Sequence, residues 1–98
     1  MTIEIKRNAE ETTIKLVGRL DTTTAPALDK TIGEDITGTK NLVLDVKELE
    51  YISSAGLRVL LGAQKKMQKI GSMKVTNVRE EVMEVFEMTG FADILTIA

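Results

Sequence analysis

Hydrophobic and polar residues alternate in two segments near the N-terminus. In residues 2–7 the two isoleucines occupy alternate positions, and residues 12–17 repeat this alternation after a polar stretch at residues 8–11. Alternation with a period of two is typical of strands that bury one face. The pattern therefore predicts an antiparallel hairpin, interrupted at Gly18.

A helix is expected next. Three threonines at residues 22–24 precede Pro26, and a threonine could cap a helix that begins there, since proline is tolerated in a first turn. Leu28 and Ile32 lie one turn apart on its apolar side. Residues 33–40 are polar and contain glycine, which predicts the exit from this helix.

The next segment differs, because residues 41–46 form a nearly continuous apolar run. Such a run predicts a strand covered on both faces. A helical pattern follows Ser54 and ends at Gly71, and residues 73–78 return to a strand-like pattern. The apolar positions of this helix recur at spacings of three and four residues: Leu57, Leu60, Leu61, Ala63 and Met67.

A third helix is predicted over residues 80–89, with acidic residues at its start that suit the helix dipole. Its expected inward residues are Val82, Val85, Phe86 and Met88. An apolar tail at residues 94–98 adds a further candidate strand. The predicted fold class is α/β, a single domain over residues 1–98 with a mixed four- to five-stranded sheet and helices packed on it.

Composition narrows the chemistry. The chain contains no cysteine and no histidine, which removes the usual zinc ligands, a cysteine nucleophile and a histidine-based triad. It has three aromatic residues and a net charge of -2, so neither base stacking nor a basic phosphate-binding surface is expected. We expect no catalytic residue, no metal, no cofactor and no direct contact with nucleic acid.

The N-terminal segment alternates like a strand and lacks the apolar core of a signal peptide, and no segment approaches membrane-spanning length. The absence of cysteine fits a reducing compartment. We therefore expect a cytoplasmic protein with no membrane contact.

Residues 51–58 place two serines between a buried strand and the first turn of a helix. In one interpretation Ser53 or Ser54 caps the helix, and Gly56 allows close packing. In the other, the free N–H groups and the dipole of the helix tolerate a phosphate, which changes the outer surface strongly. The residue pattern alone leaves both open.

Three motifs are similar to the STAS family over nearly the whole chain: Gly18-Arg-Leu-Asp21, Leu42-Val-Leu-Asp45 and Tyr51-Ile-Ser-Ser-Ala-Gly-Leu57. The nearest branch resembles the bacterial anti-sigma factor antagonists. That resemblance implies a domain whose unphosphorylated form binds an anti-sigma factor with serine kinase activity and frees a sigma factor. Phosphorylation by this partner ends the complex, and a phosphatase restores it.

The resemblance also implies roles for individual residues. Ser54 takes the position of the phosphorylated serine, and Ser53 stands where the family usually has an aspartate and is the fallback acceptor. Asp21 is assigned to partner contact or to the polarity of the phosphoryl site, with a turn or cap carboxylate as the alternative. Leu57 is expected to anchor the helix. The expected partner surface comprises Asp21, Thr22, Ser53, Ser54, Gly56 and Arg58.

Two other functions remain as alternatives. STAS-like domains also resemble subunits of transporters and signalling assemblies, so the chain could be a non-switching scaffold or a small-ligand-binding module. An autonomous enzyme has little support, because the carboxylates at residues 80–87 lack the signature of a polar cleft.

Overall fold

The N-terminal hairpin forms as expected. The computed structural model describes residues 1–36 and 38–98. In it, β1 (Thr2–Asn8) and β2 (Glu11–Leu20) pair antiparallel across a two-residue turn. Gly18 does not interrupt β2. It adopts a φ of 103° beside a shift in register, a backbone conformation that glycine accommodates without strain.

The described residues form one four-stranded sheet in the order β1-β2-β3-β4. Strands β3 (Asn41–Ile52) and β4 (Ser72–Thr76) each pair parallel with their neighbour, which confirms the mixed sheet. β3 is twice as long as the apolar run, because it continues through residues 47–50 alongside the irregular end of β2. The C-terminal tail makes a single bridge between Val75 and Ile97 and not a fifth strand.

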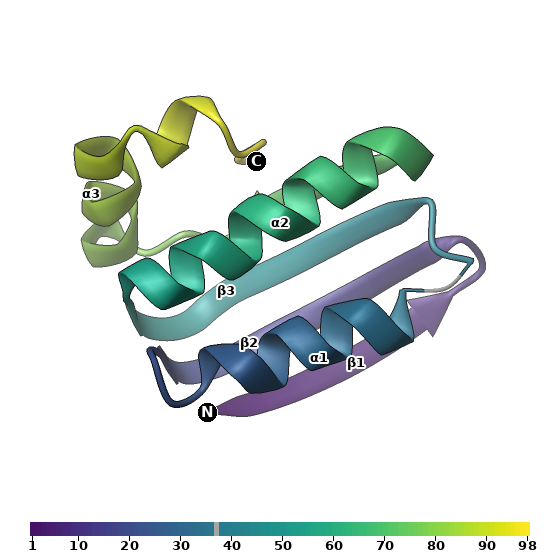
Figure 1. Cartoon of the computed structure of the whole chain (residues 1–98), viewed down its shortest axis with the longest axis horizontal. Helices are drawn as coiled ribbons and strands as arrows, with labels where there is room; N and C mark the ends of the chain where they lie inside the picture. Colours follow the sequence, from purple (N-terminus) through teal and green to yellow (C-terminus); the bar gives the residue numbers. More distant parts are fainter. Residues whose placement is uncertain (37) are drawn as a thin grey trace.

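Helices α1 (Ala25–Asp35) and α2 (Ser54–Ile70) lie on the same face of the sheet, and α3 (Glu80–Thr89) lies at one end of the molecule (Figure 1). A short 3-10 helix, η1 (Phe91–Asp93), follows α3. α1 continues past Gly33, so the predicted exit begins later, and Thr37 within it lies outside the described residues. None of the described helices is long and apolar enough to cross a bilayer.

The core lies between the sheet and the helices. Alternate strand residues are buried there against the apolar side of α2, whose buried residues are Gly56, Leu57, Leu60, Ala63, Gln64 and Met67. The expectation that the strand at residues 41–46 is covered on both faces is wrong. Val43 points to the far face, where the side chains of its strand neighbours Thr13 and Lys74 flank it and leave it 8% exposed.

The apolar side of α3 is narrower than predicted. Val82 and Phe86 are fully buried and Val85 is half-buried, but Met88 is 86% exposed. Two residues span about 200° around a helix, so Met88 lies nearly opposite Phe86. Its predicted inward orientation is wrong for this reason.

Candidate functional site

Two strand ends meet at one edge of the sheet. β2 and β3 are parallel and end at paired residues, Leu20 and Ile52. The N–H of Ser53 donates to the carbonyl of Leu20 at 2.9 Å. The turn after β2 and the start of α2 are therefore held side by side, which brings the segment from Asp21 next to the two serines.

The helix start distinguishes the two serines. Ser53 has the extended backbone of a cap residue, and its Oγ accepts a hydrogen bond from the N–H of Gly56 at 3.4 Å. Ser54 is the first residue of α2, and its side chain is exposed. Its hydroxyl makes no hydrogen bond within the described part of the chain. Ser53 is thus the cap, and the Ser54 hydroxyl is free for chemistry.

The same helix start retains unpaired backbone donors. A helix leaves four N–H groups without helical acceptors, here those of Ser53, Ser54, Ala55 and Gly56. Leu20 and the Ser53 side chain accept from the first and the last of them. In residues 1–36 and 38–98, the N–H groups of Ser54 and Ala55 have no acceptor. Both point to a position where negative charge is favoured by the helix dipole.

Gly56 has a packing role. A Cβ at this position would lie 2.7 Å from Cγ of Leu20 and 2.9 Å from Cγ1 of Ile52, closer than side chains tolerate. Only glycine lets α2 approach the strand ends this closely. Gly56 is buried, and its place on the partner surface stays a prediction. Leu57 is 5% exposed and anchors the helix as predicted.

Asp21 organises the turn between β2 and α1. Its Oδ1 accepts hydrogen bonds from the Thr23 hydroxyl at 2.7 Å, from the Thr23 N–H at 3.0 Å and from the Thr24 N–H at 3.2 Å. The hydroxyl of Thr23 holds the pKa of Asp21 below its usual 3.8. Thr24 occupies the cap position of α1, but its hydroxyl donates back to the carbonyl of Arg19 at 2.8 Å and does not cap the helix.

A shallow groove of about 290 Å³ lies between the first turns of α1 and α2, and Ala55, which directly follows Ser54, is part of its lining. It brings together Thr22 and Arg58, both predicted as partner contacts. The prediction from sequence motifs did not include the other residues that line the groove. Their only sequence signal is the one-turn spacing of Ala55 and Val59. The lining residues are Thr22, Ala25, Pro26, Asp29, Ala55, Arg58 and Val59.

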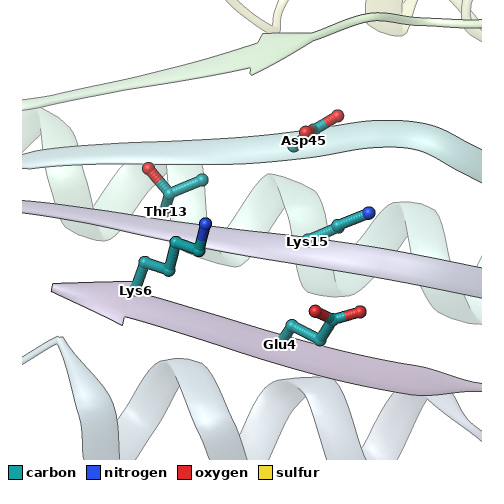
Figure 2. Close-up of a pocket in the computed structure, with 5 residues that line it drawn as sticks. All are labelled: Glu4, Lys6, Thr13, Lys15 and Asp45. Atoms are coloured by element: carbon teal, nitrogen blue, oxygen red, sulfur yellow. The ribbon is translucent and has the colours of Figure 1, made fainter.

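A second, smaller pocket of about 130 Å³ lies on the sheet face that carries no helix, and Figure 2 shows its lining side chains: Glu4, Lys6, Thr13, Lys15 and Asp45. Two of these charges already have partners. Lys15 pairs with Glu48 at 2.6 Å, and Asp45 accepts from the Asn77 amide at 3.1 Å. Among the described residues, no cluster of three or more carboxylate, histidine or cysteine side chains could hold a metal ion.

Known proteins share this sequence pattern. The model of the STAS domain family matches residues 2–98. The anti-sigma-B factor antagonist of Bacillus subtilis strain 168 is 29% identical over 97 residues, covering 98% of this chain and 89% of the relative. The anti-sigma-B factor antagonist of Listeria monocytogenes is 32% identical over 101 residues, covering 99% of this chain and 88% of the relative.

Solved structures share the fold. An anti-sigma factor antagonist from Mycobacterium paratuberculosis superposes with a TM-score of 0.88 at 24% identity, covering 98% of this chain and 83% of that one. The unphosphorylated form of SpoIIAA superposes with a TM-score of 0.78 at 17% identity, covering 99% of this chain and 87% of that one. The phosphorylated form of SpoIIAA superposes with a TM-score of 0.77 at 19% identity, covering 99% of this chain and 91% of that one. Because the model of the STAS domain family matches almost the whole length of the chain, the chain belongs to this family.

Proposed function

We propose that this chain is an anti-sigma factor antagonist that is switched by phosphorylation of Ser54. The unphosphorylated form binds an anti-sigma factor with serine kinase activity, so that a sigma factor is released, and the domain itself performs no catalysis. The observation that carries the proposal is the exposed Ser54 hydroxyl, free of any capping role, beside the groove between α1 and α2. Several relatives are named as antagonists of this kind.

The switch acts through charge at an unchanged helix start. A phosphate on Ser54 adds about -1.5 to -2 charges near neutral pH. The N–H groups of Ser54 and Ala55, and the guanidinium of Arg58 one turn along α2, favour this charge locally. The fold is therefore retained, whereas an apolar or acidic partner surface is repelled.

The unmodified surface fits an apolar element flanked by charge. Ala25, Pro26 and Val59 supply the apolar walls of the groove, while Asp29 and Arg58 supply one charge of each sign. A partner side chain seated there lies close to Ser54, which directly precedes Ala55 in the groove wall. A phosphate at this rim would have to lose water on binding, and that cost weakens the complex.

The direct test combines the chain with a cognate anti-sigma factor and ATP, then maps phosphate by mass spectrometry and measures binding by calorimetry. We expect phosphate on Ser54 in the wild type, none in Ser54→Ala, and binding of Ser54→Ala that ATP does not reverse. Ser54→Asp should weaken binding at least tenfold. Phosphate on Ser53 instead would move the switch to the fallback acceptor.

Ser72 provides the matched control, because it is an exposed serine at the opposite end of the sheet, where its hydroxyl donates to Asn41. Ser72→Ala and Ser72→Asp should bind and accept phosphate as the wild type does. If neither serine of the helix start is modified and Ser54→Asp binds normally, the chain is instead a non-switching scaffold or ligand-binding module.

The proposed activity belongs in the cytoplasm, where sigma factors act, and a reversible switch requires a phosphatase that removes phosphate from Ser54. Fractionation of the source cells and recovery of the unphosphorylated form after the stimulus ends would test these two points.

A further inference from the structure

The outer edge of the sheet is formed by β1. Within the described residues this strand pairs only with β2, so one side of its backbone has no strand partner. Figure 1 shows β1 as the outermost strand of the sheet. An unpaired edge presents N–H and C=O groups that can pair with another strand. With seven residues, β1 makes such an edge roughly 24 Å long.

The side chains of β1 divide between the two faces. Ile3 and Ile5 pair with Leu16 and Ile14 on the helix side, and Ile5 remains 40% exposed. Glu4 and Lys6 project from the opposite face (Figure 2). Neither of these two charges makes an ion pair in the described part of the chain. The edge therefore carries an exposed isoleucine between two charges of opposite sign, of which Glu4 lies opposite Lys15 on β2 without forming a close ion pair with it.

The order of these residues is complementary to itself. Two copies can pair antiparallel about a two-fold axis that passes beside one residue of β1. That residue then faces its own copy, and residues equally far before and after it face each other on the same side of the sheet. With Glu4 or Lys6 on the axis, identical charges face each other, which is unfavourable. With Ile5 on the axis, the two isoleucines meet, and Glu4 of each copy faces Lys6 of the other.

We propose that β1 is a self-association edge through which two copies of this chain form a symmetric dimer centred on Ile5. The dimer joins two four-stranded sheets into one, keeps both sets of helices on the same face, and forms two Glu4–Lys6 pairs. A single pair of strands buries less than the roughly 1,200 Å² of most stable interfaces, so the dimer is weak and depends on concentration. Its exposed charge pairs weaken in high salt.

Sedimentation equilibrium of the full chain from micromolar to millimolar concentration tests the proposal. We expect the average mass to rise toward twice that of the monomer at low salt, and less so at high salt. Lys6→Glu alone and Glu4→Lys alone should remain monomeric at concentrations where the wild type dimerises. The double variant Glu4→Lys/Lys6→Glu should dimerise again, because it restores opposite charges in the same register.

The sharpest readout is an equimolar mixture of the two single variants. A strand with two cations then faces a strand with two anions, so the mixture should form heterodimers although neither variant associates alone. Lys74→Glu, which makes the same charge change on β4 at the far edge of the same sheet face, should dimerise like the wild type. Circular dichroism confirms that each variant is folded.

Three results would overturn the proposal: a wild type that stays monomeric at millimolar concentration, a Lys6→Glu variant that dimerises normally, or a mixture of single variants that stays monomeric. None of these measurements uses a partner protein or phosphate, so the outcome is independent of the switch at Ser54.

Discussion

At the start of α2, two adjacent serines have separate tasks because the chain changes conformation between them. Ser53 retains an extended backbone, which turns its hydroxyl back toward the N–H of Gly56, whereas Ser54 has entered the helix and its hydroxyl faces outward. Under the proposed function, the structural role belongs to the hydroxyl of Ser53 and the regulatory role to the hydroxyl of Ser54. Phosphate on Ser54, as proposed, would change the charge of the helix start without removing the cap.

Alanine substitutions should separate these tasks. Ser53→Ala removes the acceptor for Gly56 N–H and should lower the free energy of unfolding by about 0.5 to 2 kcal/mol. Ser54→Ala removes an exposed hydroxyl without a partner and should change the free energy of unfolding by less than about 0.5 kcal/mol. Urea denaturation followed by circular dichroism measures both. A larger loss for Ser54→Ala than for Ser53→Ala would contradict this assignment of the cap.

Two glycines of α2 should respond in opposite directions to the same substitution. Gly56→Ala places a methyl group 2.7 Å from Cγ of Leu20 and should destabilise the fold by about 1 to 3 kcal/mol. Gly62 is exposed on the same helix with no atom within 4 Å of the added Cβ, so Gly62→Ala should stabilise by about 0.5 to 1 kcal/mol. Thermal denaturation of both variants gives the comparison, and equal effects would rule out the close contact at Gly56.

Among the elements, α3 shows how a helix can match its predicted bounds and still present a narrower buried side. It contacts the rest of the fold mainly through β3 and η1, near one end of the molecule. Only the stripe through Val82 and Phe86 is fully buried. Its apolar residues beyond that stripe lie partly or largely in solvent.

Truncation of two residues in α3 should show this difference. Phe86→Ala empties a fully buried site and should cost about 3 to 5 kcal/mol, which is a large part of the stability of a small domain. Met88→Ala removes a side chain that is 86% exposed and should change stability by less than about 0.5 kcal/mol. Chemical denaturation at constant temperature measures both, and a large loss for Met88→Ala would require that residue to be buried.

At the scale of the whole molecule, several carboxylates link the fold to pH. Donation from the Thr23 hydroxyl lowers the pKa of Asp21, and the Lys15 ammonium lowers the pKa of Glu48. Partial burial raises the pKa of Asp45. The hydrogen bonds from the Asn77 amide and the Lys47 N–H, together with nearby lysine charges, outweigh this effect, so the pKa of Asp45 is also lowered. Groups with a depressed folded pKa stabilise the fold above their unfolded pKa.

This stabilisation should disappear in acid. The contribution of Asp21 is fully present above its usual pKa of 3.8 and is lost as the pH falls through the lower value of the folded state. The melting temperature of Asp21→Asn should therefore lie below that of the wild type at neutral pH, and the difference should shrink at about pH 2 to 3. Asp29→Asn removes a carboxylate that accepts no hydrogen bond in the described residues, and is the control. A difference for Asp21→Asn that does not change with pH would contradict the turn bonds.

The sequence by itself determined the order of the elements, the hairpin, the mixed sheet, the span of α3 and the segment that contains the candidate switch. These features depend on short-range periodicity and local motifs, because alternation or helical spacing reports which side of an element is buried. The end of α2 followed from Gly71 for the same local reason.

Only the tertiary structure decided which serine caps α2, why Gly56 is required, and how α1 and α2 form a groove beside Ser54. It also decided that one sheet face carries no helix and that β3 extends to Ile52. The cap bond itself joins Ser53 to Gly56 three residues on, although the N–H of Ser53 is held by the distant carbonyl of Leu20. The other features depend on contacts between segments far apart in the sequence, such as Gly56 against Leu20 and Ile52 beside Leu20. Hydrophobic periodicity reports that a residue is buried, but the fold alone determines which neighbour buries it.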